Sequence, residues 1–262
     1  MKKFLYILIC LIFSASSIFA QSVSVEYGNN PQAGHYALVN GIQLYYETYG
    51  SGEPLIMLHG NGGSINVFSN QIPFFEKHYQ VIAIDSRLQG KSGGSPETIS
   101  YELMASDFCA LMDQLQIKSA NVLGWSDGGI DGILMAMNCP GKVNKLAISG
   151  ANTVPDSSAV TNADILGMKE FVAKQEKASK VAVALVQMMI DQPNIPYESL
   201  KQIHCPVLVM AGDHDMIKAE HTLKIYQSIP SASLCIFPDS NHGVCQQHPE
   251  LFNNTVLTFF TK

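Results

Sequence analysis

The feature that most constrains the fold of this chain is the repeated alternation of short apolar runs with stretches of helical periodicity. Runs that are apolar throughout are typical of parallel strands, because helices cover both faces of a parallel sheet. The predicted strands occupy residues 35–39, 42–48, 54–58, 80–84, 120–123, 143–148, 207–211 and 233–237. The first two flank Asn40-Gly41, a strong hairpin signal. We therefore predict an α/β fold with an eight-stranded, mostly parallel sheet, an antiparallel start and helices on both faces.

Helical periodicity predicts helices over residues 100–115, 127–138 and 249–261. The interval from 152 to 203 interrupts the alternation, since it separates two predicted strands by more than one crossover helix requires. It contains helical windows at 164–172 and 179–190. We predict that this insertion forms a short helical lid over a binding cleft. The alternative is that its helices pack without any role in binding.

Size and charge limit the classes of partner. The 262 residues are 47% apolar, which is enough for one compact domain and short for two. Only 15% are charged, the formal net charge is −6, and no basic run occurs. This balance disfavours a disordered chain, a nucleic-acid partner and an anionic membrane surface. A small molecule is the expected partner, and the sequence leaves the oligomeric state open.

The N-terminus has the layout of a secretory signal peptide. Two lysines (Lys2 and Lys3) precede an apolar run over residues 4–13, and Ala20 offers a small residue before Gln21. The run is about half of the ~20 residues needed to cross a bilayer, so we expect no stable membrane anchor after cleavage. We predict a signal peptide over residues 1–20, one α/β domain over 21–262, and export to a periplasm or the medium.

Five cysteines remain after such a cleavage, and they are widely spread: Cys109, Cys139, Cys205, Cys235 and Cys245. No Cys-x-x-Cys spacing occurs, and none has a zinc-type spacing to a histidine. Mostly buried free thiols are expected. An oxidised pair is the alternative for an exported chain, with a connectivity that the sequence does not give. Neither a metal nor a cofactor is implied.

The pattern Gly-x-Ser-x-Gly occurs twice. The match at residues 90–94 lies several residues after its strand and is followed by Ser-Pro, so no helix begins there. The match at residues 124–128 directly follows the strand 120–123 and opens a helix. Only the second has the strand–turn–helix context that exposes a nucleophilic serine. Ser126 is therefore the candidate nucleophile.

A serine nucleophile needs a base, and the base needs an orienting acid. His242 lies in the loop after the last predicted strand, whereas the rival His248 stands beside a proline at a helix start. Asp213 and Asp215 both follow the strand 207–211, and the pattern alone does not separate them. The order nucleophile, acid, base along the chain is that of one fold in particular.

With these motifs, residues 55–260 resemble the α/β-hydrolase superfamily. The resemblance implies that Asp215 is the acid, because it ends a Gly-x-x-Asp pattern, and that Asp213 is structural. The turn at residues 59–62 (His-Gly-Asn-Gly) resembles the oxyanion loop of the family. By this match, the main-chain N–H groups of Asn61 and Asp127 would hold the oxyanion. Residues 85–92 resemble a further family pattern, in which Leu88 replaces a glycine.

A narrower likeness concerns residues 124–129 (Gly-Trp-Ser-Asp-Gly-Gly) and 150–152 (Gly-Ala-Asn). They are similar to the valacyclovir-hydrolase-like, or biphenyl-hydrolase-like, branch. Members of that branch hydrolyse esters of α-amino acids, and the resemblance implies that the Asp127 side chain binds the substrate amine. The alternative is that Asp127 favours the positive N-terminus of its helix.

These observations predict an exported serine hydrolase that cleaves a small carboxylic ester or amide through Ser126, His242 and Asp215. A carbon–carbon-bond hydrolase or an aminopeptidase on the same triad is the alternative. A dehalogenase would need an aspartate in place of Ser126. A non-catalytic binding protein on the same scaffold is a further alternative, although such proteins usually lose a member of the triad.

Overall fold

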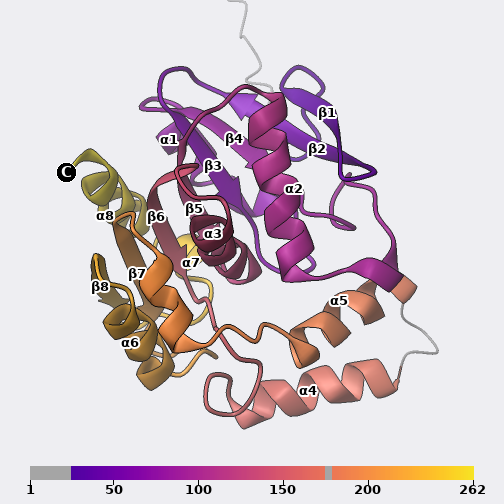
Figure 1. Ribbon diagram of the computed structural model, residues 1–262, viewed down its shortest axis with the longest axis vertical. Helices are drawn as coiled ribbons and strands as arrows, with labels where there is room; N and C mark the ends of the chain where they lie inside the picture. The colour runs from indigo at the N-terminus through magenta and orange to yellow at the C-terminus, as the bar shows by residue number, and fades with distance from the viewer. Residues whose placement is uncertain (1–24, 175–178) are drawn as a thin grey trace, which may run out of the picture.

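The computed structural model describes residues 25–174 and 179–262, so the predicted signal peptide lies outside the described residues. Its centre is an eight-stranded sheet with the order β1-β2-β4-β3-β5-β6-β7-β8 (Figure 1). The strands are β1 Gly34–Val39, β2 Ile42–Tyr49, β3 Pro54–Leu58, β4 Gln80–Ile84, β5 Ala120–Trp125, β6 Val143–Ser149, β7 Val207–Gly212 and β8 Ala232–Phe237. β2 pairs antiparallel with β1 and β4, and the pairs from β4 to β8 are parallel. The predicted α/β fold, with its antiparallel start, is confirmed.

The side chains of the central strands alternate between two hydrophobic cores, one on each face of the sheet. In β3, Ile56 and Leu58 belong to the core under α2 and α3, whereas Leu55 and Met57 belong to the opposite core. All four are fully buried. This explains why the strand reads as a continuous apolar run in the sequence.

Helices cover both faces, as predicted. The first core is closed by α2 Tyr101–Gln114, α3 Asp127–Asn138 and α6 Ala219–Ser228, and the second by α1 Ile72–Phe75, α7 Val244–Gln247 and α8 Pro249–Thr261. Helix α2 begins where the Ser100 side chain accepts a hydrogen bond from the Leu103 N–H, at 3.1 Å. Such a cap satisfies one of the N–H groups left without a partner in the first turn.

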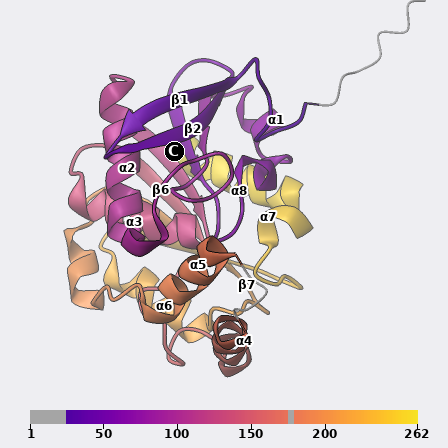
Figure 2. The ribbon, with the colours of Figure 1, turned by 90° about the vertical axis from the view of Figure 1, so that its right-hand side faces the viewer.

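The insertion between β6 and β7 holds α4 Asn162–Ala173, α5 Lys180–Asp191 and the 3₁₀ helix η4 Tyr197–Gln202. In both views α5 lies between α4 and the rest of the molecule (Figures 1 and 2). Leu185 and Met188 of α5 are buried, whereas α4 has no buried residue. Helix α4 begins two residues before and ends one residue after its predicted window at 164–172, and α5 begins and ends one residue later than its window at 179–190. That they act as a lid stays a prediction.

The expectation of mostly buried free thiols holds only in part, since the alternative, an oxidised pair, is present and one of the three free thiols is buried. Cys109 of α2 and Cys139, directly after α3, form a disulfide with Cα atoms 6.6 Å apart. Cys205, Cys235 and Cys245 are free thiols. The bond joins two neighbouring helices on one face of the sheet, and a separation of 30 residues leaves no local pattern to predict it.

Across residues 25–174 and 179–262, none of the helices combines the length and the apolar character needed to cross a bilayer.

Candidate active site

Ser126 stands at a sharp turn between β5 and α3. Its backbone has φ +56° and ψ −121°, a conformation that non-glycine residues rarely adopt. The two glycines of the motif make the turn possible, because there is no room for a side chain at either. A Cβ on Gly124 would lie 2.1 Å from the Gly128 oxygen, and a Cβ on Gly128 would lie 2.1 Å from the Leu58 oxygen.

The turn brings Ser126 to His242 and Asp215. The Ser126 Oγ lies 2.8 Å from His242 Nε2, and His242 Nδ1 lies 2.7 Å from Asp215 Oδ1. The Asp215 side chain is 1% exposed and that of His242 is 22% exposed. The same Asp215 oxygen accepts the Ile217 N–H at 2.9 Å, which fixes the carboxylate. The carboxyl ends of β5, β7 and β8 lie at one edge of the sheet, and this brings the three residues together.

The loop that carries His242 follows β8 and is held by Asp213. The Asp213 carboxylate accepts the N–H groups of Asp239, at 3.1 Å, and Ser240, at 2.9 Å. The hydrogen bond from Ser240 lowers the pKa of Asp213. Asp213 therefore does not contact His242, and the structure separates the two acids that the pattern of the sequence left equivalent.

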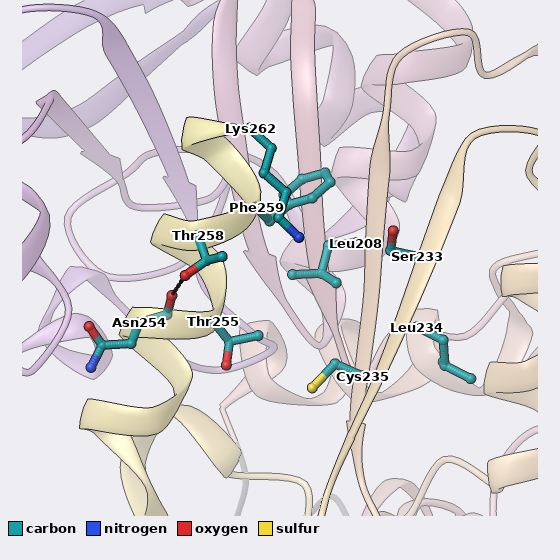
Figure 3. Close-up of a pocket in the computed structure, with 9 residues that line it drawn as sticks. All are labelled: Leu208, Ser233, Leu234, Cys235, Asn254, Thr255, Thr258, Phe259 and Lys262. Carbon is teal, nitrogen blue, oxygen red and sulfur yellow. Dashed lines mark hydrogen bonds between the residues drawn. The ribbon is translucent and has the colours of Figure 1, made fainter.

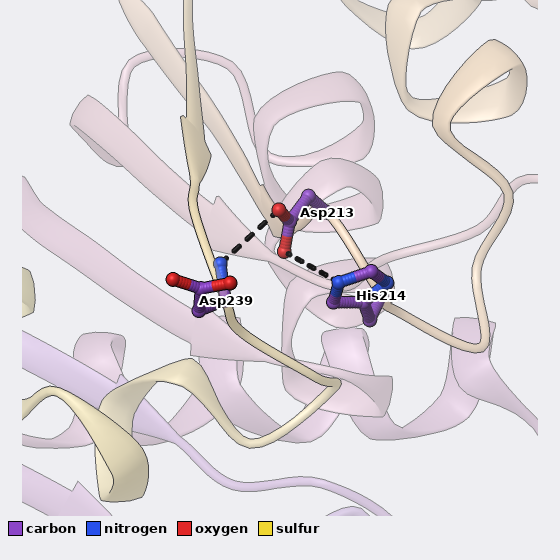
Figure 4. Close-up of side chains that lie close together, drawn as sticks. All are labelled: Asp213, His214 and Asp239. Atoms are coloured by element: carbon purple, nitrogen blue, oxygen red, sulfur yellow. Dashed lines mark hydrogen bonds and ion pairs between the residues drawn. The ribbon is translucent and has the colours of Figure 1, made fainter.

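Asp213, His214 and Asp239 also form an exposed cluster whose potential ligand atoms lie within 4.8 Å of one another (Figure 4). Both Asp213 oxygens already accept main-chain N–H groups of this loop. Because these contacts explain why Asp213 lies beside the loop, we assign the cluster a structural role and no metal.

The predicted oxyanion donors are close to Ser126, since Asp127 directly follows it and Asn61 follows Gly60, which packs against it. Neither the Asn61 nor the Asp127 main-chain N–H donates to an acceptor among the described residues, as an oxyanion site requires. The turn after Asn61 is fixed by Gln89, whose Oε1 accepts the Gly62 N–H at 2.6 Å. A Cβ on Gly60 would lie 2.9 Å from that of Ser126, so the turn packs directly against the nucleophile.

Two hydrogen bonds of the His59 ring help to hold this turn in place. Its Nε2 accepts the Ser86 N–H at 3.0 Å, so its Nδ1 carries the hydrogen and donates to the Gly60 carbonyl at 2.8 Å. Burial lowers the pKa of His59 to about 4. The residue is therefore a neutral structural histidine near neutral pH.

The Asp127 side chain is buried and 3% exposed. Its Oδ2 accepts a hydrogen bond from Asn61 Nδ2 at 2.8 Å, and the same amide donates to the Leu185 carbonyl of α5 at 3.3 Å. Burial raises the pKa of Asp127 to about 6, against hydrogen bonds from Asn61 and Tyr101 that lower it. The carboxylate thus has neutral partners and faces the oxyanion turn and α2.

Asp131 lies one helical turn further along α3, fully buried, and neither of its carboxylate oxygens has a partner among the described residues. Burial, and then the neighbouring charge of Asp127, raise the pKa of Asp131 well above its usual value. A buried carboxyl without a partner is held in its neutral form.

His248, the rival base, is separate from the triad and approaches only the Asp239 carbonyl, at 3.5 Å. A cavity of about 430 Å³ between β8 and α8 is lined by Leu208, Cys235, Thr255 and Phe259, with five other residues, and contains none of the predicted site residues (Figure 3). A second cavity, of about 300 Å³, lies between the oxyanion turn and α5 and includes Asn61, Gln89 and Leu185.

Comparisons with known proteins agree with this geometry. The family described as the alpha/beta hydrolase fold matches residues 53–178. The serine hydrolase BPHL of Mus musculus is 28% identical over 249 residues, covering 84% of each chain. The chain belongs to the α/β-hydrolase superfamily. It is accordingly a hydrolase, and the BPHL likeness agrees with the branch that the motif at residues 124–129 resembles.

Other relatives of this α/β hydrolase have diverse printed activities. A putative carbamate hydrolase, RutD, of Caulobacter is 27% identical, over 83% of this chain and 96% of its own. An esterase structure from Exiguobacterium antarcticum superimposes with a TM-score of 0.78 at 23% identity, covering 87% of this chain and all of that one. At this identity the superposition supports the fold alone.

Three residues beside the site were missed by the sequence analysis. Gln89 shapes the oxyanion turn, as described above. Gly150, at φ +65°, packs against the triad, since a Cβ there would lie 2.8 Å from the His242 ring. Trp125 contacts the loop of His242. The Gly-Ala-Asn match at residues 150–152 was a signal for Gly150, whereas nothing in the sequence pointed to the contacts of Gln89 or Trp125.

Proposed function

We propose that this hydrolase cleaves a small carboxylic ester or amide by acyl transfer through Ser126, His242 and Asp215. The observation that carries the proposal is the continuous hydrogen-bonded row from the Ser126 Oγ through both nitrogens of His242 to Asp215. The strained backbone of Ser126 supports it, because such strain persists where the surrounding structure imposes it and is concentrated at active sites.

In this mechanism the ionised Asp215 holds the hydrogen on His242 Nδ1 and leaves Nε2 free to accept a proton. The Ser126 oxygen attacks the substrate carbonyl while its proton passes to His242 Nε2. The Asn61 and Asp127 N–H groups donate to the oxyanion that develops. His242 then protonates the leaving alcohol or amine, and the acyl-enzyme is released by a water molecule that gives its proton to the same nitrogen.

The proposal is tested with a fluorophosphonate probe on the purified domain (residues 21–262). We expect one covalent adduct, located on Ser126 by mass spectrometry, and loss of nitrophenyl ester hydrolysis in proportion to labelling. Ser92→Ala serves as the matched control, because it alters the other Gly-x-Ser-x-Gly match. A protein that hydrolyses esters while Ser126 stays unlabelled would contradict the proposal.

Carbon–carbon-bond hydrolysis is the second candidate for the same triad. Its support is a relative from Metapseudomonas resinovorans, 24% identical over 93% of this chain, named as a 2-hydroxy-6-oxo-6-(2'-aminophenyl)hexa-2,4-dienoic acid hydrolase. A panel that includes simple esters, aminoacyl esters and a dienoic keto acid separates the candidates. Turnover of the keto acid with no turnover of any ester would favour the second.

Esters of α-amino acids are the narrower substrate class that the BPHL-like motif favours. A substrate ammonium would bind the Asp127 carboxylate in place of the Asn61 amide, a charge-assisted hydrogen bond of about 1.5–3 kcal/mol, or roughly 10–150-fold in kcat/KM. The carboxylate has neutral partners, an amide and a hydroxyl, which leaves its charge available.

The test of this class is the ratio of kcat/KM for an aminoacyl ester to that for a neutral ester of equal size. Both substrates need His242 as a neutral base, so the effect of its protonation on the rate is the same for both and cancels in the ratio. Because the pKa of Asp127 is raised to about 6, the preference should fall as the carboxylate is protonated below that pH, and it should fall again at alkaline pH, where the substrate ammonium loses its proton. Asp127→Asn should remove the preference at every pH. A ratio near one in the wild type would leave a general serine esterase with no preference for the free amine.

Export is proposed on two independent observations, the signal-like residues 1–20 and the disulfide between Cys109 and Cys139. Disulfides of this kind persist in oxidising compartments. Expressed with its natural N-terminus in a bacterium, the protein should be recovered outside the cytoplasm, begin at Gln21 and contain the disulfide. Recovery from the cytoplasm with Lys2 and Lys3 still attached would contradict export.

A further inference from the structure

Trp125, the residue before the nucleophile, joins three parts of the candidate site. Its indole N–H donates a hydrogen bond to the His242 carbonyl at 2.8 Å. The centroids of the Trp125 and His242 rings lie 5.7 Å apart. On its other side, the indole packs on the oxyanion turn, because a Cβ on Gly60 would lie 3.2 Å from it.

The loop that carries His242 has few other attachments to the rest of the site. Asp213 holds its beginning at Asp239 and Ser240, and Gln247 accepts the Asn241 N–H at 2.8 Å on its exposed side. The contact is made at His242 itself by Trp125, the last residue of β5, which directly precedes Ser126. It therefore fixes the position of the base relative to the nucleophile.

We infer that Trp125 is a positioning residue, whose indole N–H holds His242 at hydrogen-bonding distance from Ser126. This inference rests on the proposed function and adds to it a residue that touches neither substrate nor the reacting atoms. The rate of a reaction that depends on such a distance falls steeply when the groups separate, by as much as ~10²-fold for a displacement of about 1 Å.

The first experiment replaces Trp125 by phenylalanine, which keeps an aromatic ring and removes the N–H donor. We expect kcat to fall about 10- to 100-fold with KM almost unchanged, since the displaced group acts in the chemical step. Labelling of Ser126 by the fluorophosphonate should slow by a similar factor. Both assays are run far below the melting temperature of the variant, so that lost stability does not affect them.

Gln247→Ala is the matched control, because it removes a hydrogen bond to the same loop one residue before His242. We expect its kcat to stay close to that of the wild type. An equal loss in both variants would overturn the specific role of the indole. So would a Trp125→Phe protein with wild-type kcat and labelling rate. If Ser126 of the wild type is not labelled at all, the proposed function fails instead.

Trp125 is the single tryptophan of the chain, so the tryptophan fluorescence of the protein comes from this residue alone. A protonated imidazole quenches indole fluorescence at close contact, so emission should fall as the pH is lowered through the titration of His242. Its midpoint should match that of the acid limb of kcat/KM. The Asp215 carboxylate contacts the imidazole at 2.7 Å, and Asp127 is near enough for their charges to interact, so Asp127→Asn is used to remove the contribution of Asp127 to the fluorescence change.

Two histidine variants complete this experiment. His242→Gln should abolish the fluorescence change, whereas His248→Gln should keep it. Burial lowers the pKa of His59, beneath the oxyanion turn, to about 4, so His59 stays neutral near neutral pH. A change that persists in His242→Gln, or whose midpoint departs from the activity profile in the wild type, would overturn the contact as a reporter of the base.

Discussion

The two Gly-x-Ser-x-Gly segments, residues 90–94 and 124–128, place their serines in opposite environments. The Ser92 hydroxyl is engaged by the main chain, since it donates to the Asp85 carbonyl at 2.6 Å and accepts the Tyr45 N–H at 2.8 Å. The Ser126 hydroxyl contacts an imidazole instead, at 2.8 Å. Ser92 connects a loop to β2, whereas Ser126 stands at the end of β5. The comparison shows that the Gly-x-Ser-x-Gly pattern alone does not make a serine a nucleophile. The strand–turn–helix around the serine decides whether its hydroxyl is exposed to a base.

The largest difference between the two segments is expected in catalysis. Ser126→Ala removes the nucleophile and should lower kcat about 10⁵–10⁶-fold, because the members of a triad act as a unit. Ser92→Ala removes a hydroxyl that only the main chain contacts, so its kcat should stay close to wild type. Steady-state hydrolysis of a nitrophenyl ester measures both. Comparable losses in the two variants would break the comparison.

The second difference concerns the acids. Asp215→Asn favours the wrong tautomer of His242 and should lower kcat on the order of 10⁴-fold. Asp213→Asn keeps one oxygen to accept an N–H of the loop and should cost far less. The measurement is kcat for both variants at the pH optimum of the wild type. A deeper defect in Asp213→Asn would mean that the loop, rather than the tautomer, limits the reaction.

The third difference concerns the glycines. A Cβ on Gly128 would lie 2.1 Å from the Leu58 oxygen, and this contact is with backbone that cannot turn away. We expect Gly128→Ala to lower the free energy of unfolding by more than about 4 kcal/mol, an exceptional value for one methyl group. At Gly93 a Cβ would lie 3.6 Å from its nearest neighbour, the Gln43 oxygen, which is ordinary contact.

Gly93→Ala is therefore the control in urea unfolding, and should leave the free energy of unfolding almost unchanged. Failure of Gly128→Ala to fold, while Gly93→Ala folds, agrees with the prediction. Two variants of equal stability would show that α3 shifts freely against β3.

The sequence predicts the strands well because each depends on a local property. The two cores cover both faces of β3 and β4, so these strands are apolar throughout, and their predicted bounds agree with those in the structure. Helix α6 was not predicted. Two of its three buried residues, His221 and Thr222, are polar, so the mean hydropathy of the segment is low and few apolar residues mark its buried face.

The candidate site likewise has residues that a local pattern predicts and contacts that no local pattern predicts. Ser126 and His242 could be found because each follows a strand at the edge where sites in such sheets form. The contact of Trp125 joins residues 117 positions apart, and the disulfide joins residues 30 apart. Neither pair has a local pattern. The direction of the Asp127 side chain depends on packing against Asn61 and Tyr101, which a motif does not specify.

The smallest expected difference is in the stability that Ser92 supplies. Replacing it by alanine leaves the Tyr45 N–H and the Asp85 carbonyl without their partner in a half-buried loop. An unsatisfied group of this kind typically costs about 1–3 kcal/mol, and solvent that enters the loop brings the cost toward the lower end. Urea unfolding of Ser92→Ala measures it, with the exposed Ser69→Ala as a control for the loss of a hydroxyl. A variant as stable as the control would mean that the loop closes without Ser92, and that the first Gly-x-Ser-x-Gly segment has neither a chemical nor a structural role.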